Sequence, residues 1–520
     1  MTGLSHPLAI VPQDELVARA EADPHRPRFH FVSPAGWLND PNGVSQWNGT
    51  YHLFYQYNPT GAFHHRILWG HATSPDLVNW TDKPVALEPS DGPDADGCWS
   101  GVLVNDGGTP TLVYSGRQGE RELPCVAVGS PDLLSWTKAP ENPVISGAPT
   151  GVDITAYRDH CVWREGSGWR QLVGSGIRGR GGTAFLYESH DLRSWNYIGP
   201  LFIGDASAGD PAATDWEGTM WECVDLFRVG PGVLGDAAGP LVEGNAGPDV
   251  LVFSAWDDGD TRHPLYWTGR YAGDSYSPWQ LRRLDYGGRY FYAPQSFADD
   301  GGRRVMFGWL QEGRTDGAMV EAGWSGVMSL PRVATLDAQG ELAFAPVAEI
   351  ESLRRDHVRI GPREVAGSEV LAGVGGNQLD LELNLDMETG SVFRLGILGS
   401  AACPGGAGTE ETVIEIRRHA GISGDSFLAL DRSRSSLDLS VDSEEKSGPV
   451  TLPGGRLRLR VLVDRSAVEI FANGKPLTAR VYPTLGGTAV RLSAEGAVHL
   501  RQLDAWRMEG IFSGPRPLFP

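Results

Sequence analysis

Three acidic residues in the first half of the chain occupy positions where a carboxylate could be held in one direction for catalysis. They are Asp40 in GWLNDPNG, Asp159 in TAYRDHCVW and Glu222 in GTMWECVDLF. Each is expected where a short apolar strand begins or ends, beside aromatic or small residues. Taken singly, each carboxylate is more simply a turn cap, an edge-strand acid or a member of an ion pair. Taken together, they are candidates for one acidic site.

The residues around Asp40 predict how its side chain is fixed. Aspartate is disfavoured inside a strand, and Pro41 favours an extended conformation for the residue before it. The dipeptide Asn42-Gly43 is typical of a tight turn with positive φ. We therefore expect Asp40 at the very end of a strand, immediately before the chain reverses.

Composition restricts the kind of partner. The chain has 520 residues and a formal net charge of −21. Such a surface repels nucleic acids and anionic membranes, because binding to either needs clustered Lys and Arg. The chain contains no run of about 18 apolar residues, so no membrane span is expected. A neutral small molecule is the expected ligand.

Cysteine usage and the N-terminus bear on the compartment. The N-terminus has no basic start followed by a long apolar core, so it does not resemble a secretory signal, and residues 15–22 predict a short amphipathic helix. A cytoplasmic setting is expected, and secretion stays open if a signal has been removed. Without a CxxC or a Cys/His cluster, neither a disulfide framework nor a zinc site is expected. The five scattered cysteines are Cys98, Cys125, Cys161, Cys223 and Cys403.

A repeat indicates the architecture that positions the three acids. Ser-x-Asp-Leu-x-x-Trp occurs at 74–80, 130–136 and 189–195, at a spacing of about 57 residues. The Ser/Asp pair suits a turn in which side chains bond nearby backbone amides, and Leu and Trp would pack back onto a sheet. A period of about 50 residues with several short strands in each is typical of a β-propeller. Carboxylates from different blades can meet where the inner strands converge.

The pattern changes near residue 350. Sixteen of the 17 tryptophans precede this point. Beyond it, segments such as 378–387 and 456–464 alternate apolar and polar residues, which is the period of half-buried antiparallel strands. An all-β chain with a propeller followed by a β-sandwich is expected. The expected parts are an N-terminal extension with a short helix (1–27), the propeller (28–345) and the sandwich (352–511).

A series of longer motifs runs through nearly the whole chain. In order, they are GWLNDPNG, YHLFYQYNP, WGHATSPDLVNW, CWSG, YRD, WECVDLF, LDYGGRYFYAPQSF, GWL, GWSGVMSLPR and VDRSAVEIFANG. Together they resemble glycoside hydrolase family 32, the family of invertases, levanases, inulinases and sucrose-6-phosphate hydrolases. The resemblance implies a five-bladed β-propeller followed by a C-terminal β-sandwich. It also implies an enzyme that needs no metal and no organic cofactor.

The resemblance implies roles for the three acids. Asp40 matches the nucleophile, Glu222 the general acid/base, and Asp159 the carboxylate that holds fructose hydroxyls and stabilises the transition state. A retaining glycosidase needs its nucleophile and acid roughly 5–5.5 Å apart, the first ionised and the second protonated. Backbone amides and Asn39 are expected to favour the ionised form of Asp40. Trp221 and a neighbouring carboxylate are expected to keep the proton on Glu222.

Further residues match the family's fructose pocket. Arg158 is expected to pair with the carboxylates and to help keep Asp159 and Asp40 charged. Trp99 and Trp309 would offer flat apolar walls for a sugar face. The other matching residues are Asn39, Gln56 and Ser100.

Two stretches depart from the family pattern. Arg158-Asp159-His160 replaces the usual Arg-Asp-Pro, which loosens the backbone after Asp159 and adds a titratable ring. Space filling is the simpler role for His160. The stretch AFHHRILWG lacks a common Trp-Gly pair on the leaving-group side of the pocket, so an altered acceptor site is expected there, with His64 among the substrate-binding residues. Cys223 follows the acid as in the family and is expected to pack rather than to react.

The leading prediction is a retaining glycosidase that cleaves terminal β-D-fructofuranosyl units from sucrose, fructo-oligosaccharides, levan or inulin. A fructosyltransferase, such as a levan fructotransferase, is the main alternative within the same chemistry. A non-catalytic fructan-binding protein is opposed by the intact set of three acids. A five-bladed glycosidase of arabinose polymers is opposed by WLNDPNG and by the sandwich.

The sandwich and two arginines leave further questions open. The sandwich shows no aromatic stripe of the kind that marks a lectin surface, so a structural or dimer-forming role is expected. The chain is accordingly expected to be a monomer or a homodimer. A 6-phosphate on the substrate could meet Arg66 or Arg117, although solvated surface positions are the simpler expectation for both.

Overall fold

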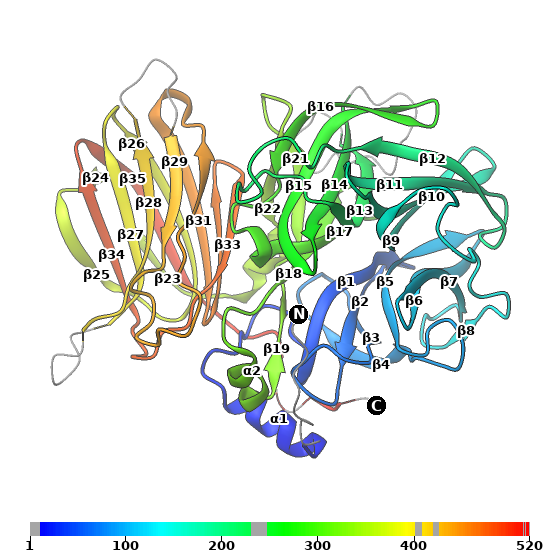
Figure 1. Cartoon of the computed structure of the whole chain (residues 1–520). Helices are drawn as coiled ribbons and strands as arrows, with labels where there is room; N and C mark the ends of the chain where they lie inside the picture. The colour runs from blue at the N-terminus through cyan, green and yellow to red at the C-terminus, as the bar shows by residue number, and fades with distance from the viewer. Residues whose placement is uncertain are drawn as a thin grey trace.

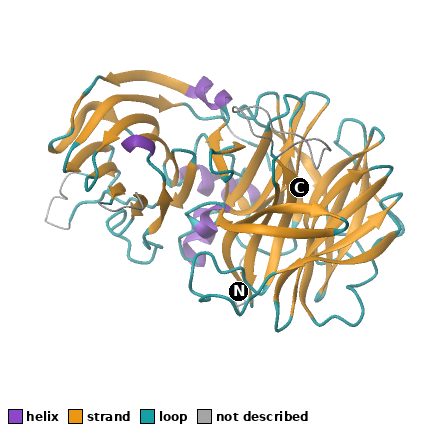
Figure 2. Ribbon diagram, turned by 90° about the horizontal axis from the view of Figure 1, so that it is seen from above, coloured by secondary structure: helices purple, strands orange, loops and turns teal. Residues whose placement is uncertain are grey.

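The protein, seen here as a computed structural model, is built almost entirely of strands and loops (Figure 2). Figure 1 shows two parts side by side, the blue-to-green strands of residues 36–346 and the yellow-to-red strands of residues 354–508. The α-helices of the described chain are α1 (Gln13–Ala22) and α2 (Asp316–Ala322), which contact each other, and 3₁₀ turns span Gly288–Phe291, Ala348–Leu353 and Pro453–Gly455. The structure describes residues 11–229, 247–400, 408–419, 426–512, 514 and 516–518.

Five sheets of four or five strands follow one another along the first part. The first sheet holds β1 (Gly36–Trp47), β2 (Thr50–Asn58), β3 (Leu68–Ser74), β4 (Thr81–Leu87) and β19 (Trp324–Ser325), and the second β5 (Gly97–Asp106), β6 (Thr109–Gln118), β7 (Arg121–Gly129) and β8 (Trp136–Lys138). The third holds β9 (Ile154–Glu165), β10 (Gly168–Ile177), β11 (Gly181–Ser189) and β12 (Trp195–Ile203). The fourth holds β13 (Met220–Arg228), β14 (Asp249–Asp257), β15 (Asp260–Ala272) and β16 (Ser275–Arg283). The fifth holds β17 (Tyr292–Ala298), β18 (Arg304–Leu310), β20 (Val327–Met328), β21 (Arg332–Leu336) and β22 (Leu342–Pro346).

The first strands of these sheets share one irregularity. β1, β5, β9, β13 and β17 contact one another in a closed cycle, as expected for strands that line a propeller axis. Each carries one more residue than its partner strand at a mid-strand register shift, which is a β-bulge that bends the strand and redirects its side chains. The bulges fall at Asn39–Asp40, Trp99–Ser100, Asp159, Cys223–Val224 and Ala293–Pro294.

The prediction that the chain reverses directly after Asp40 is wrong. β1 continues through Pro41 and Gly43 to Trp47, and the reversal comes at Asn48-Gly49, whose φ values are 50° and 80°. Two register shifts in the pairing with β2 accommodate Pro41 and Gly43, because bulges tolerate residues that a regular ladder excludes. A bulge, rather than a turn, therefore fixes the direction of Asp40.

The three Ser-x-Asp-Leu-x-x-Trp segments form the same turn, as predicted. In the first copy, the hydroxyl of Ser74 donates to Asp76, which also accepts the backbone N–H groups of Val78 and Asn79. The central leucine of the three copies has φ of 64°, 61° and 63°, and its carbonyl accepts the tryptophan indole N–H at 3.1 Å each time. The turns join the third and fourth strands of the first three sheets.

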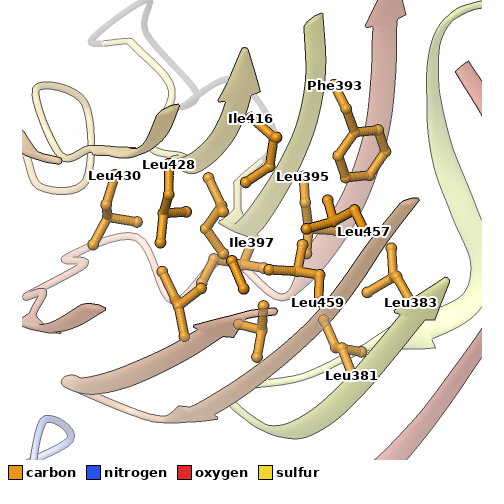
Figure 3. Packing of buried hydrophobic residues seen from close by; sticks show 14 of the residues in the cluster. Leu381, Leu383, Phe393, Leu395, Ile397, Ile416, Leu428, Leu430, Leu457 and Leu459 are labelled. Carbon is orange, nitrogen blue, oxygen red and sulfur yellow. The ribbon is translucent and has the colours of Figure 1, made fainter. Parts of the chain in front are cut away.

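Two sheets face each other in the second part, as the predicted alternation requires. One has the order β23-β35-β26-β31-β32-β33 with β24 beside β35, and the other has the order β25-β34-β27-β28-β29-β30. Leucines on alternate positions of β26, such as Leu381 and Leu383, are buried against Leu395 and its neighbours (Figure 3). The strands are β23 (Arg354–Ile360), β24 (Arg363–Glu364), β25 (Gly367–Gly375), β26 (Gln378–Met387), β27 (Val392–Gly399), β28 (Thr412–Arg418), β29 (Ser426–Asp431), β30 (Lys446–Val450), β31 (Arg456–Asp464), β32 (Ala467–Ala472), β33 (Lys475–Arg480), β34 (Ala489–Glu495) and β35 (Val498–Met508).

Buried ion pairs join the two parts. Arg332 of β21 reaches Asp285 and Glu469, each at 2.7 Å, and Glu469 belongs to β32 of the second part. His30 lies between Asp464 and Glu469, at 2.9 and 3.2 Å. All of these side chains are buried, and the pairs Arg332–Glu469, His30–Asp464 and His30–Glu469 each join one part to the other.

Candidate active site

A cavity of about 1440 Å³ lies where the bulged strands meet. Ser100 is not among the residues that line the cavity, but its Oγ lies 2.5 Å from Oδ2 of Asp40, which does line it. The structure therefore brings all ten predicted site residues together. The nine that line the cavity are Asn39, Asp40, Gln56, His64, Trp99, Arg158, Asp159, Glu222 and Trp309.

Neutral side chains hold the carboxylate of Asp40. Its Oδ2 accepts from Ser100 Oγ at 2.5 Å and from Gln56 Nε2 at 3.1 Å, and its Oδ1 accepts from Asn39 Nδ2 at 3.2 Å. Burial raises the pKa of Asp40 to about 6, the bond from Ser100 opposes this shift, and the charge of Glu222 adds to it. The surroundings thus favour the ionised form less than expected, but Asp40 is still mainly ionised at neutral pH.

Asp159 is the extra residue of the β9 bulge and has a φ of 64°. Its backbone N–H donates to Ser115 Oγ at 3.0 Å, and its Oδ2 accepts the backbone N–H of Cys223 at 3.0 Å. Burial raises the pKa of Asp159, the charge of Glu222 adds to the rise, and Arg158 opposes it. Hydrogen bonds therefore fix Asp159 at two points, its backbone N–H and its carboxylate.

Cys223 connects two of the acids. Its Sγ lies 3.5 Å from Oδ2 of Asp159 and 3.7 Å from Oδ2 of Asp40. Burial raises the pKa of the thiol well above its usual range, so the thiol keeps its proton and donates it to one of the two oxygens. Cys223 is therefore a hydrogen-bond donor as well as the packing residue that was expected.

Arg158 pairs with one of the three acids, Glu222, but not with Asp40 or Asp159. Its Nε and Nη2 donate to Oε1 of Glu222, at 3.0 and 2.7 Å, and its Nη1 donates to Oε2 of Glu122 at 2.9 Å. The guanidinium therefore pairs with two glutamates instead of Asp159 and Asp40. It still opposes the rise in the pKa of Asp159 through its nearby charge.

Tyr292, rather than Trp221, lies beside the second oxygen of Glu222. Its Oη is 2.6 Å from Oε2 of Glu222 and 3.1 Å from the carbonyl oxygen of Ala255. Trp221 is fully buried and stacks on Phe253 at 4.2 Å, because neighbouring residues of a strand face opposite sides. Tyr292 was not predicted as a site residue, although it directly precedes the β17 bulge within LDYGGRYFYAPQSF.

An aromatic row, formed by Trp309, Trp37, His64 and Trp99, lines one side of the cavity. Successive ring centroids lie 5.8, 6.0 and 5.5 Å apart. Burial lowers the pKa of His64 to about 4, so its ring is neutral near pH 7. The row offers apolar faces and neutral N–H groups, which suits a sugar better than an ion. Trp37 was missed, although it lies within GWLNDPNG.

The rest of the wall comes from segments far apart in the sequence. Phe63, His65 and Arg66 join His64 there, which confirms that the divergent stretch faces the cavity. Arg117 stacks on Trp99 at 4.4 Å and also lines the cavity. Ala62 and Leu68 of the same divergent stretch also line the cavity. The remaining lining residues were not predicted, and they are Trp37, Asn58, Thr60, Glu122, Trp256, Gly259, Asp260, Thr261, Arg262, Arg289, Tyr292, Gln311, Glu312, Arg314, Asp316, Met319 and Val320.

Three further features of the described ranges bear on the expectations for a metal, a membrane span and disulfides. No group of three or more His, Cys, Asp or Glu side chains suited to a metal ion occurs there. No helix in those ranges is long and apolar enough to cross a bilayer. Cys403 lies outside them, and the cysteines found free are Cys98, Cys125, Cys161 and Cys223.

An all-β chain that gathers buried carboxylates in a cavity with an aromatic wall has the construction of a glycosidase. The family model "Glycosyl hydrolases family 32 N-terminal domain" matches residues 30–346, and "Glycosyl hydrolases family 32 C terminal" matches residues 349–507. The chain belongs to this family and is a glycosidase, which confirms the resemblance seen in its motifs.

Known relatives agree with this assignment. The fructan 6-exohydrolase of Beta vulgaris is 32% identical and the match covers 94% of this chain and 87% of the relative. The sucrose-6-phosphate hydrolase of Escherichia coli is 31% identical, over 93% of this chain and 94% of the relative. The crystal structure of fructan 1-exohydrolase IIa from Cichorium intybus superposes with a TM-score of 0.84 at 28% identity, over 94% of this chain and 98% of that one. A variant of the same enzyme was solved in complex with 1-kestose.

Proposed function

We propose that this glycosidase releases terminal β-D-fructofuranosyl units with retention, from sucrose, fructo-oligosaccharides or fructans. The observation that carries the proposal is the presence of Asp40, Asp159 and Glu222 in one cavity, with Cys223 between the first two and Arg158 on the third. The names of the relatives, which are fructan exohydrolase, β-fructofuranosidase and sucrose-6-phosphate hydrolase, support a fructosyl substrate.

The proposed reaction has two steps. In the first, Glu222 gives a proton to the leaving-group oxygen while the carboxylate of Asp40 attacks C2 of the fructosyl unit and the C2–O bond breaks. In the second, Glu222 takes a proton from water, which attacks C2 and frees Asp40. Asp159 accepts hydrogen bonds from fructose hydroxyls, and its charge stabilises the oxocarbenium-like transition state.

We also infer that the five sheets of residues 36–346 are five blades of one propeller. The closed cycle of their first strands and the common bulge support this inference. The proposed domains, 28–345 and 352–511, agree closely with the two family matches. The proposed N-terminal extension, 1–27, includes α1, and its residues 1–10 lie outside the described ranges.

A fructosyltransferase remains the second candidate. It would follow the same first step, and a sugar hydroxyl would replace water in the second. The specific observation in its favour is the divergent stretch Phe63, His64, His65 and Arg66, all of which line the cavity where an acceptor sugar would lie. The monomeric or homodimeric state and the cytoplasmic setting stay predictions.

Analysis of early products tests the proposal. The purified protein is incubated separately with sucrose, levan and inulin, and the products are followed by chromatography. Free fructose as the main product from any of them supports the hydrolase, and the ranking of rates names the substrate. Cyclic difructose or longer oligosaccharides with little free fructose would establish the transferase. No turnover of any of the three would overturn both.

A further inference from the structure

A short chain of hydrogen bonds runs behind Asp159, away from its carboxylate. The backbone N–H of Asp159 donates to Ser115 Oγ at 3.0 Å, and the same oxygen lies 3.0 Å from Nε2 of His160. Ser115 belongs to β6 of the second sheet and the other two residues to β9 of the third. The side chains of Ser115 and His160 are both buried. These hydrogen bonds therefore connect the second and third sheets next to Asp159, which lines the cavity.

The hydroxyl of Ser115 has one hydrogen and two lone pairs. Its oxygen accepts the N–H of Asp159 with one lone pair, and its bond to Nε2 of His160 uses the O–H or the second lone pair, according to the tautomer of the imidazole. The other ring nitrogen, Nδ1, is buried without a hydrogen-bond partner. Burial lowers the pKa of His160 to about 3, so the ring stays neutral over the working pH range.

We propose that Ser115 and His160 are positioning residues that act on the reaction through Asp159. Asp159 is the extra residue of its bulge and has a φ of 64°, a conformation that residues with a side chain rarely adopt. Ser115 Oγ accepts the backbone N–H of Asp159, and the backbone N–H of Cys223 donates to its carboxylate. These two hydrogen bonds set the direction of the Asp159 side chain, and Ser115, held by His160, accepts the one from the backbone N–H.

The inference gives His160 a task beyond filling space. Proline has no side-chain hydrogen-bonding group, whereas the imidazole of His160 fixes the Ser115 hydroxyl, which in turn fixes Asp159. The inference rests on the proposed function only for the way its effect is read out, namely as loss of fructosyl transfer. The placement of the Asp159 peptide is a structural quantity that can be measured without activity.

A double-mutant cycle tests the inference. Ser115→Ala is measured for kcat/KM on sucrose in the wild type and in Asp159→Asn. A misplaced catalytic group costs on the order of 100-fold in rate, so we expect a loss of about 10- to 100-fold in the wild type. In Asp159→Asn the loss should fall below about 3-fold, because the residue through which Ser115 acts is already disabled.

Two further variants define the chemistry. His160→Phe keeps a ring but removes the hydrogen bond to Ser115 and should reproduce the loss, whereas His160→Gln offers a side-chain amide that can donate or accept and should restore part of the rate. Ser175→Ala is the matched control, since Ser175 is also buried and its Oγ donates to the backbone carbonyl of Ala156 in β9 at 2.5 Å. Its effect on kcat/KM should be small and equal in both backgrounds.

Equal losses from Ser115→Ala in both backgrounds, or no loss in either, would overturn the inference. If the wild type itself turns over neither sucrose nor a fructan, the proposed function fails instead. The inference is then decided by the crystal structure of Ser115→Ala. A backbone of Asp159 that is unchanged from the wild type would refute it, and a displaced carboxylate would support it.

Discussion

Arg158 holds Glu222 through two guanidinium nitrogens that reach the same carboxylate oxygen, Oε1, at 3.0 and 2.7 Å. The other oxygen, Oε2, is left to the hydroxyl of Tyr292 at 2.6 Å. In the proposed reaction Glu222 becomes negatively charged when it gives up its proton. Arg158 is already in place to stabilise that charge, so the proton transfer needs no rearrangement of the site.

Replacement of Asp40 by alanine should abolish turnover. Without the carboxylate no covalent intermediate can form, so kcat for fructose release should fall by at least about 10⁴-fold. Initial rates on sucrose check this, with Asp132→Ala on an exposed turn as the control. A rate near that of the wild type would rule out Asp40 as the nucleophile.

Glu222→Gln should separate two substrates. Sucrose needs a proton on its leaving group and should lose at least about 100-fold in kcat/KM, whereas fructosyl fluoride does not need one and should be partly spared. Glu122→Gln removes the other partner of Arg158 and should affect both substrates alike. An equal loss on both substrates in Glu222→Gln would mean that Glu222 is not the acid.

The acidic limb of the pH profile should report on Asp40 and Asp159 together. Burial raises the pKa of Asp40 to about 6 and that of Asp159 to about 7, and the proposed reaction needs both ionised, so kcat/KM should fall as the pH drops below about 7. The bond from Ser100 lowers the pKa of Asp40, so Ser100→Ala should move the limb to higher pH, by about one unit. A limb that stays in place or moves to lower pH would contradict this assignment.

His64 should matter for the leaving group and not for the fructosyl unit. Its neutral ring lies between Trp37 and Trp99 on the cavity wall. His64→Ala should raise KM for sucrose by about 10-fold, the loss expected for about one hydrogen bond, and leave KM for fructosyl fluoride unchanged. His190→Ala, at an exposed histidine that does not line the cavity, serves as the control. Equal increases for both substrates would place His64 against the fructosyl unit.

His71 should make stability depend on pH. Burial lowers its pKa well below the usual value, with His52 and Lys83 contributing. Between the folded pKa and about 6.5 the unfolded chain binds the extra proton, so this residue destabilises the folded state as the pH falls. The free energy of unfolding of His71→Phe minus that of the wild type should therefore rise by about 2 kcal/mol when the pH is lowered from 7 to 5.

Urea unfolding at the two pH values measures this shift. The matched control is His190→Phe, because His190 is exposed. A difference between His71→Phe and the wild type that is the same at pH 7 and pH 5 would show that His71 does not remain neutral in the folded state.

Local chemistry explains what could be predicted from the sequence. The turn at Ser74–Trp80 depends on side chains that bond backbone amides of the same segment, so these seven residues are sufficient to predict it. The alternation in β26 is likewise complete within its own strand. The gathering of Asp40, Asp159 and Glu222 was expected from the repeat, because inner strands of different propeller blades converge, and from the resemblance of their three motifs to one family.

Partner strands explain what could not be predicted. Pro41 and Asn42-Gly43 fit a turn and a bulge equally well, and pairing with β2, which begins only at Thr50, decides for the bulge. The partners of Arg158 depend on Glu122 in another sheet, and nothing in the YRD motif identifies it. Tyr292 reaches Glu222 across 70 positions of sequence, a relationship that only the arrangement of the sheets creates.

The ion pairs between the two parts limit how this family can recombine. A sandwich taken from a relative would leave the buried Arg332 with Asp285 as its one remaining acidic partner unless it brought an acid to the position of Glu469. Loss of one member of a buried pair costs about 3–5 kcal/mol, a large share of a protein's stability. Functional chimeras should therefore be those that inherit Arg332 and Glu469, together with His30 and Asp464, as one unit.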